Sequence, residues 1–309
     1  MDSPNEQRKR KPWIPLAAAL LVVAIAAGFF MRPFSFYYAY SDLRLWLGGA
    51  HSGAVVVHGI RVHYCVAGTR EGPAIVLVHG LGGRSENWLP MLPYLTRAGY
   101  RVYMIDLPGF GRSDRPQNFS YSMRAQAFIV AQFMNALNLN EADLAGWSMG
   151  GWVAQFVAAE HPEHVRRLIL FSSAGVDQIP AWNMQLFTPA NADEVRRLVA
   201  LLMPHPPYVP DFVARDFLRG SSRDAWITHR VVNSMLATTA TSDLLLPKLK
   251  MPIMIVWGSE DRIFPLSQGQ AMHSFAPQAQ FETVPGCGHL AVLQCAPSIG
   301  PEVMQFLQQ

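Results

Sequence analysis

A serine stands between glycines at one point of the chain, in the run Gly146-Trp147-Ser148-Met149-Gly150. A short apolar run precedes it and a helical pattern follows, which is the strand, turn and helix context that gives a G-x-S-x-G motif its meaning. The small flanking residues let the backbone turn sharply and expose the serine oxygen above a sheet, beside the amide donors of a helix N-terminus. Because these flanking patterns argue against a chance occurrence in a loop, Ser148 is the candidate nucleophile.

A serine hydroxyl is a weak nucleophile at neutral pH and needs a base, and ten histidines could supply one. His289 is the preferred candidate, because it lies in a glycine-flanked loop just after the strand-like run Gln280–Val284. Such a loop can hold the imidazole over the edge of a sheet. His205 and His229 fall earlier, in a helical region, and do not fit the chain order of this type of site.

The imidazole needs a carboxylate that fixes its tautomer and stabilises its charged form. The turn Gly258-Ser259-Glu260-Asp261 follows a buried strand-like run and offers two acids. Asp261 is preferred, because a short acid held in a turn is better fixed, and Glu260 remains the alternative. The resulting order of serine, aspartate and histidine is the order expected for a nucleophile elbow in an α/β fold.

An acyl-transfer reaction also needs donors for the oxyanion. The loop His79-Gly80-Leu81-Gly82-Gly83 follows an apolar run and can lie close to a substrate, so we assign the backbone N–H groups of Leu81 and Met149 to this role. The glycine spacing matches neither a P-loop nor a dinucleotide-binding turn. A second glycine-rich segment, from Asp106 to Asp114, is interpreted as a structural turn whose two acids hold loops.

These residues must be positioned by a regular framework. Alternating apolar residues at Ala54–Val57 and Ile60–Val66, joined by His58-Gly59, predict a β-hairpin. Between the later apolar runs lie helix-length segments, such as Tyr121–Leu137 and Met149–Glu160, which indicates βαβ units. The sequence therefore predicts a doubly wound, mostly parallel α/β sheet. Its buried strands are expected at Ala74–Val78, Val102–Ile105, Ala142–Trp147, Leu168–Phe171 and Ile253–Trp257.

One long segment lacks strand-like runs. Residues 175–247 carry helical patterns around Asp193–Leu202, Asp211–Leu218 and Asp224–Ala237, which predicts a helical cap between core segments 54–174 and 248–309. Many apolar side chains of the cap should pack its own helices, and the remainder should line an apolar tunnel above Ser148. The candidates are Trp182, Met184, Phe187, Leu201, Leu202, Met203, Phe212, Phe217, Trp226 and Met235.

The N-terminus carries a separate signal. Residues 13–31 are uncharged and close to the length that crosses a bilayer, which predicts a transmembrane helix. The basic tail, residues 1–12, should stay in the cytoplasm and the catalytic part should lie on the other side. Residues 32–53 form a juxtamembrane segment rich in Tyr and Trp. The alternative is a signal peptide, with Ala24-Ile25-Ala26 as a possible cleavage site.

Composition limits the partners. The formal net charge is +3, of which Arg8–Lys11, set against Asp2 and Glu6, contribute +2, so the remaining body is nearly neutral and nucleic acid is not an expected partner. With half of its 309 residues apolar, the chain can bury a sizeable core. Its cysteines are too few and too irregularly spaced for a disulfide framework or a zinc site, so we expect unpaired thiols, no metal and no cofactor. They are Cys65, Cys287 and Cys295.

Together these motifs resemble the α/β-hydrolase superfamily over about Ala54 to Leu307. The cap stretch Phe187–Val195, together with the N-terminal anchor, is similar to the ABHD-type membrane monoacylglycerol lipases and to bacterial lipases and esterases. The resemblance implies a metal-free serine hydrolase that cleaves a small-molecule or lipid ester through an acyl-enzyme. It does not settle the substrate, because one fold hosts many activities.

Other enzyme classes of this superfamily can be compared with the chain by the residue at the elbow and by their substrates. Haloalkane dehalogenases and epoxide hydrolases resemble the chain in their loops but carry an aspartate at the elbow, where this chain has Ser148. Carbon–carbon bond hydrolases of ring-cleavage products look similar down to the Ser-Met-Gly-Gly elbow and remain the alternative, although an exported anchor would separate them from an intracellular substrate. Haloperoxidase-like hydrolases share the expected residues, and a catalytically silent binding protein is a further alternative.

Overall fold

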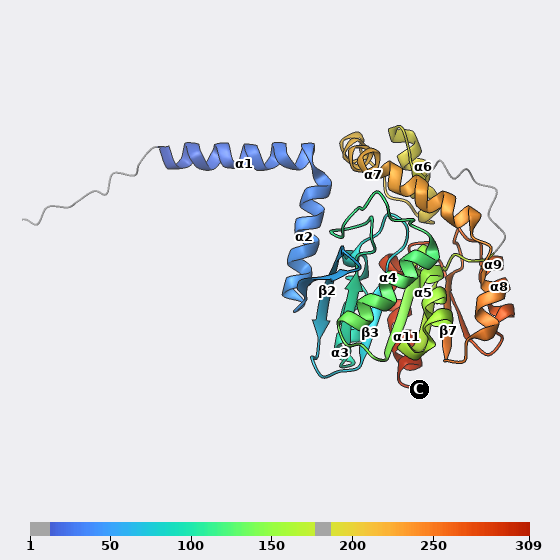
Figure 1. The fold of residues 1–309 in the computed structure, drawn as a ribbon. Coiled ribbons are helices and arrows are strands. Elements are labelled where there is room, and N and C mark those ends of the chain that lie inside the picture. The colour runs from blue at the N-terminus through green and yellow to red at the C-terminus, as the bar shows by residue number, and fades with distance from the viewer. Residues whose placement is uncertain (1–12, 177–186) are drawn as a thin grey trace, which may run out of the picture.

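The computed structural model describes residues 13–176 and 187–309, and it builds them around one eight-stranded sheet with helices on both faces (Figure 1). The predicted basic tail, residues 1–12, lies outside the described residues, as do Trp182 and Met184 of the predicted cap. The central sheet and its flanking helices form the doubly wound, mostly parallel α/β architecture that the sequence predicted.

The strands follow the predicted apolar runs closely. They are β1 (His51–Val57), β2 (Ile60–Gly68), β3 (Ala74–Val78), β4 (Arg101–Ile105), β5 (Ala142–Trp147), β6 (Val165–Phe171), β7 (Ile253–Gly258) and β8 (Gln280–Val284). Strands β1 and β2 form the predicted antiparallel hairpin, and its turn residues His58 and Gly59 both have positive φ, as a tight hairpin turn requires. Strand β2 also pairs antiparallel with β4, and the remaining pairs are parallel.

The order of the strands creates the place for a site. The sheet runs β1-β2-β4-β3-β5-β6-β7-β8, so the chain leaves β3 toward one side to form β4 and returns to the other side to form β5. The loops that follow β3 and β5 therefore diverge at the carboxyl edge of the sheet. Ligands of open α/β sheets bind at such a reversal of strand order.

Helices cover both faces of the sheet. Successive residues of a strand face opposite cores, as Leu144 and Ala145 of β5 do, and this explains why the strand sequences are apolar throughout. One core packs against α4, α5 and α9, and the other against α3 and α11. The helices around the sheet are α3 (Leu92–Arg97), α4 (Met123–Ala136), α5 (Met149–Glu160), α8 (Ser242–Leu245), α9 (Leu266–Phe275), α10 (Ala291–Gln294) and α11 (Ala296–Leu307), with short 3-10 turns η1 (Ser85–Trp88), η2 (Pro162–His164) and η4 (Leu246–Lys248).

Two helices between β6 and α8 lie across the carboxyl edge of the sheet, α6 (Ala192–Leu202) and α7 (Asp211–Ala237) (Figure 1). Helix α7 unites two segments that the sequence pattern separated at Asp211–Leu218 and Asp224–Ala237. It continues through Gly220, around which there is open space. Residues on both sides of this glycine are buried along the same helix, so packing outweighs the low helix propensity of glycine.

The first residues that the structure describes form two helices, α1 (Trp13–Met31) and α2 (Pro33–Leu47). Helix α1 extends away from the body, whereas α2 lies along it (Figure 1). The end of α1 contacts α7, where the rings of Phe30 and Phe212 lie 5.1 Å apart. Within the part of the chain that the structure describes, no single helix combines the length and apolar character that crossing a membrane requires; Ala17–Met31 and Pro33–Leu47 meet the test only as a pair bent by 103°.

The structure corrects the expectation for the cysteines. Cys287 and Cys295 form a disulfide, with their Cα atoms 6.4 Å apart, and only Cys65 is free. The pairing follows from helix α10, which folds the chain back between the two residues, and their spacing alone does not reveal it. Burial raises the pKa of the Cys65 thiol to about 11, so this thiol stays protonated.

Candidate active site

Ser148 is held at a sharp turn between β5 and α5. Its φ of 56° and ψ of −123° are unusual for a residue other than glycine. Its N–H donates to the carbonyl of Phe171 at 2.9 Å, and its own carbonyl accepts from the N–H groups of Gly151 at 2.9 Å and Ala174 at 3.0 Å. Hydrogen bonds to the neighbouring strand and to α5 thus fix the strained backbone and, with it, the direction of the side chain.

The glycines of the motif are required by packing. A Cβ atom at Gly146 would collide with the backbone of Gly150, and a Cβ atom at Gly150 would collide with the carbonyl oxygens of Val78 and His79. The first turn of α5 therefore lies directly against the end of β3. This contact brings the loop after β3 beside the serine, since a Cβ at Gly80 would stand 3.1 Å from the Cβ of Ser148.

The structure brings the three predicted side chains together. His289 Nε2 lies 2.9 Å from Ser148 Oγ, and His289 Nδ1 lies 2.9 Å from Asp261 Oδ2. The other carboxylate oxygen of Asp261 accepts the N–H groups of Ile263 and Phe264, each at 2.9 Å. The serine, histidine and aspartate are 8%, 3% and 5% exposed, so this series of hydrogen bonds is shielded from water.

The alternative acid lies elsewhere. The side chain of Glu260 is exposed, and its backbone N–H donates to the carbonyl of Cys287 at 2.9 Å. This backbone bond joins the turn after β7 to the loop that carries His289. Of the two acids that the sequence offered, only Asp261 contacts the imidazole.

Trp147 also holds His289, a contact that sequence reasoning missed. Its indole N–H donates to the backbone carbonyl of His289 at 2.8 Å, and its ring lies 5.9 Å from the imidazole. Phe264 packs edge-on against the other side of the imidazole at 5.2 Å. Trp147 occupies a variable position of the G-x-S-x-G motif, so the motif gives no signal for this role. The turn at Ser148 and the loop of His289 are thus joined by the Trp147 side chain as well as by the hydrogen bond between Ser148 and His289.

The predicted oxyanion donors lie beside the serine. Leu81 and Met149 line the same pocket as Ser148 and His289. Among residues 13–176 and 187–309, neither backbone N–H has a hydrogen-bond acceptor, and that of Met149 begins helix α5. Two donors and a helix N-terminus at one place can stabilise an anion, which is the electrostatic requirement of acyl transfer.

A buried histidine supports the loop of Leu81. His79 Nε2 accepts the N–H of Leu107 at 3.0 Å, so Nδ1 carries the proton and donates to the carbonyl of Gly80 at 2.7 Å. Burial lowers the pKa of His79, which keeps the ring neutral and this tautomer in place. The sequence placed His79 at the start of the loop but gave it no role.

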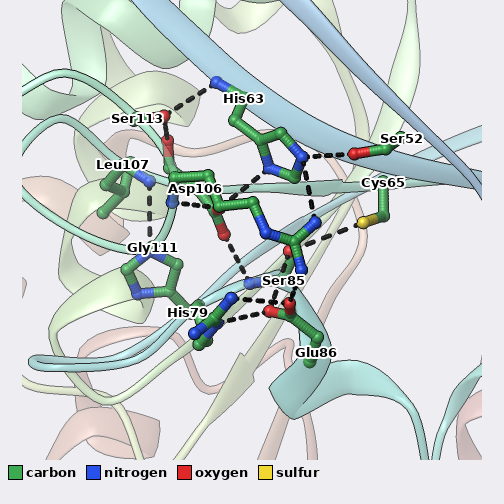
Figure 2. Close-up of polar contacts among 12 residues, drawn as sticks. Ser52, His63, Cys65, His79, Ser85, Glu86, Asp106, Leu107, Gly111 and Ser113 are labelled. Carbon is green, nitrogen blue, oxygen red and sulfur yellow. Dashed lines mark hydrogen bonds and ion pairs between the residues drawn. The ribbon is translucent and has the colours of Figure 1, made fainter. Parts of the chain in front are cut away.

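Asp106 organises the layer behind this loop, as Figure 2 shows. It accepts hydrogen bonds from Nδ1 of His63 at 2.8 Å, the N–H of Ser85 at 2.6 Å and the N–H of Arg112 at 2.8 Å. Burial by itself would raise the pKa of Asp106, but the hydrogen bonds from His63 and from the N–H of Arg112 outweigh it and lower the pKa to about 2. Asp106 therefore holds loops as a carboxylate, as the sequence predicted.

Above Ser148 lies an apolar pocket of about 290 Å³. Of the predicted tunnel residues, Phe187, Leu202, Phe217 and Met235 line it. Phe212 and Trp226 instead contact other aromatic rings, Phe212 those of α1 and Trp226 that of Tyr121. Leu198, Leu236, Trp152, Ile263, Phe264 and Leu290 complete most of the apolar wall. In the described ranges, no three His, Cys, Asp or Glu side chains gather as a metal site would require.

Comparison with known protein families gives a match over most of the chain. Residues 73–294 fit the model of the family described as alpha/beta hydrolase fold. This range runs from the residue before β3 to the end of α10, and it contains Ser148, Asp261 and His289.

Individual proteins are similar to the chain at low sequence identity. The chain is 27% identical over 250 residues to Lipase 1 of Psychrobacter immobilis, which covers 76% of this chain and 77% of that protein. It is 29% identical over 269 residues to the 2-hydroxy-6-oxononadienedioate/2-hydroxy-6-oxononatrienedioate hydrolase of Comamonas testosteroni. This match covers 80% of this chain and 91% of that protein. The crystal structure of a membrane phospholipase A is similar with a TM-score of 0.81 and 28% identity, covering 95% of this chain and 97% of that one.

The packing of the elbow predicts opposite effects for two glycine substitutions. Gly150→Ala should greatly lower the yield of folded protein or its melting temperature, because the new methyl group meets backbone oxygens that cannot move aside. Gly220→Ala, in open space within α7, should stabilise the fold by about 0.5–1 kcal/mol. Thermal unfolding of the two variants measures both effects. Equal melting temperatures would contradict the described packing of α5 against β3.

Proposed function

We propose that this chain, which belongs to the alpha/beta hydrolase fold family, is a serine hydrolase that cleaves lipid-like carboxylic esters, with monoacylglycerols as the representative substrates. The observation that carries the proposal is the hydrogen-bonded series from Asp261 through His289 to Ser148 at the wall of an apolar pocket. A buried acid, base and hydroxyl in this order form the arrangement that activates a serine.

In the proposed reaction, the hydroxyl oxygen of Ser148 attacks the ester carbonyl while His289 Nε2 takes the hydroxyl proton. Asp261 keeps the imidazole in the required tautomer and stabilises the imidazolium that forms. The negative charge on the carbonyl oxygen is stabilised by the N–H groups of Leu81 and Met149.

The tetrahedral intermediate then collapses. The bond to the alcohol breaks, His289 gives its proton to the leaving oxygen, and the acyl group remains on Ser148. Water enters as the second nucleophile, loses a proton to the same imidazole, and releases the carboxylic acid. No step requires a metal or an organic cofactor.

The pocket supports a long apolar acyl group. Its wall is formed mainly by aliphatic and aromatic side chains, and its described lining contains no Lys or Arg. An apolar acyl chain is bound favourably there, whereas a carboxylate that entered this pocket, such as one of those in the dioates named for the Comamonas testosteroni relative, would lie there without a cation. The similarity to Lipase 1 and to a membrane phospholipase A supports the same choice. Carbon–carbon bond hydrolysis remains the second candidate because of that Comamonas relative.

The proposal includes attachment to a membrane. Residues 13–31 would cross the bilayer, residues 1–12 would remain in the cytoplasm, and the catalytic part would lie on the other side. In support, α1 carries no charged residue and many of its large apolar side chains are exposed, as are several on α2. Tethering of this kind would keep the pocket close to lipid substrates.

Substitutions of the three central residues test the mechanism. Ser148→Ala, His289→Ala and Asp261→Asn should each lower kcat for p-nitrophenyl esters by about a thousandfold or more, and a fluorophosphonate should label the wild type but not Ser148→Ala. Glu260→Gln is the matched control, because its exposed carboxylate does not contact the imidazole. Labelling without turnover would favour another reaction of an activated serine, and wild type that neither labels nor turns over would favour a silent binding protein.

Acyl length tests the substrate class. Each methylene that enters the pocket should contribute at most about 0.8 kcal/mol, so kcat/KM should rise by up to about fourfold per methylene until the pocket is filled. A series of p-nitrophenyl esters and monoacylglycerols of graded length, with a ring-cleavage dioate for comparison, measures this. A maximum at acetate would indicate a short-chain esterase, and preferential cleavage of the dioate would indicate the carbon–carbon hydrolase.

Fractionation tests the anchor. The full chain should stay in the membrane fraction through high-salt and carbonate washing, with its N-terminus intact. Leu21→Arg combined with Val22→Arg should weaken retention, because each arginine costs about 2.5–3.5 kcal/mol near the centre of a membrane helix. Recovery of a free protein that begins near Ala27 would show instead that the segment is a cleaved signal peptide.

A further inference from the structure

A second cavity, of about 460 Å³, adjoins the apolar pocket. The two share Gly82, Phe187, Phe217 and Thr228 in their linings, so one molecule of sufficient length can occupy both. Helices α2 and α7 and the loops after β3 and β4 enclose this second cavity. Its lining is charged, in contrast to the pocket above Ser148, with Arg32, Arg84, Arg115, Arg223, Asp216 and Asp224.

The charges of this cavity do not balance. The carboxylate of Asp224 lies 2.8 Å from Arg223 and 3.4 Å from Arg115, so one acid faces two guanidinium groups. Asp216 likewise faces two, Arg219 at 2.9 Å and Arg32 at 3.7 Å. Arg219 does not line the cavity, so within the lining Asp216 is balanced by Arg32 and the surplus positive charge belongs to the group around Asp224. This charge at the wall of the cavity attracts an anion.

The arginines differ in how firmly they are held. Arg84 is bound by Glu86 through two hydrogen bonds and adds no surplus charge. Arg115 donates to the carbonyls of Ser113 at 3.1 Å and Gly111 at 3.0 Å, which fixes its guanidinium at the wall of the cavity. Arg223 is 73% exposed on its side chain and can turn toward a ligand. The cavity thus combines one fixed and one adaptable guanidinium on the same acid.

We propose that this charged cavity is a subsite for the anionic phosphate of a lipid headgroup, an inference that rests on the proposed function. The ester bond would lie at Ser148 and the acyl chain in the apolar pocket. The glycerol would pass Gly82, and the phosphate would meet Arg115 and Arg223. Guanidinium groups bind phosphate with paired, charge-assisted hydrogen bonds, so the preferred substrates are monoacyl glycerophospholipids with a net negative charge.

The location of the cavity agrees with this ligand. Arg32, Phe34, Ser35 and Tyr38, which line it, belong to the junction between α1 and α2 and to the first turns of α2. The exposed apolar surface of α1 begins at the same junction, so a lipid held near α1 has a short path into the cavity. A headgroup that stays near the lipid surface while its acyl chain reaches Ser148 would fit this arrangement.

The test compares two substrates with the same acyl chain in neutral detergent micelles, a monoacylglycerol and an anionic lysophosphatidylglycerol. For the full-length wild type, kcat/KM should be higher for the phospholipid. In Arg223→Gln the ratio of the two kcat/KM values should fall by about tenfold, through KM, and in Arg223→Glu it should fall further. Arg124→Gln, whose 67% exposed side chain pairs with Glu160 outside the cavity, is the matched control and should leave the ratio unchanged.

The outcomes separate the two proposals. If both substrates are cleaved and the ratio is the same in wild type and Arg223→Glu, the headgroup subsite is wrong and the proposed ester hydrolase stands. If neither substrate is cleaved, the proposed function fails and the subsite fails with it. Inorganic phosphate should inhibit cleavage of the phospholipid competitively. If it inhibits the wild type but the phospholipid is not preferred over the monoacylglycerol, the cavity binds free phosphate, which overturns the headgroup assignment.

Discussion

The backbone of Ser148 is the constraint on which the remaining architecture depends. A non-glycine residue at φ 56° and ψ −123° costs about 1–3 kcal/mol, and such a conformation persists only where its surroundings enforce it. Here the enforcement comes from hydrogen bonds to the residues around the end of β6 and from the close contact of Gly150 with the end of β3. Three parallel strands must therefore be in register before the serine side chain can point away from the sheet.

The histidine and the aspartate opposite Ser148 are held as firmly. Trp147, in the turn of Ser148, donates to the backbone carbonyl of His289. One carboxylate oxygen of Asp261 accepts two backbone N–H groups, so the other oxygen is directed at the imidazole. Below the Leu81 loop, the neutral ring of His79 and the ionised Asp106 hold the ends of β3 and β4 together. The site is preorganised by buried polar contacts rather than by the loops themselves.

The space above the site consists of an apolar part and a charged part. An apolar pocket and a charged cavity meet at Gly82 and at residues of α7. Helix α7 contributes Met235 and Leu236 to the pocket, Asp216 and Arg223 to the cavity, and Phe217 to both. Its position also links substrate binding to the N-terminal helices, since Phe212 contacts α1 and Asp216 accepts the N–H of Phe34 in α2.

The sequence by itself determined the strands, the hairpin, the elbow at Ser148 and the choice of His289, because each leaves a local pattern of apolar runs, glycines and turn residues. It limited the acid to Glu260 or Asp261, and the tertiary structure decided for Asp261, whose Oδ2 lies 2.9 Å from His289 Nδ1. Only the tertiary structure decided the disulfide of Cys287 with Cys295, the bond from Trp147 to His289 and the grouping of arginines from α1–α2, α7 and the loop after β4. These features join residues through folding rather than through a periodic pattern, and contacts between distant segments depend on the strand order and packing of the whole sheet.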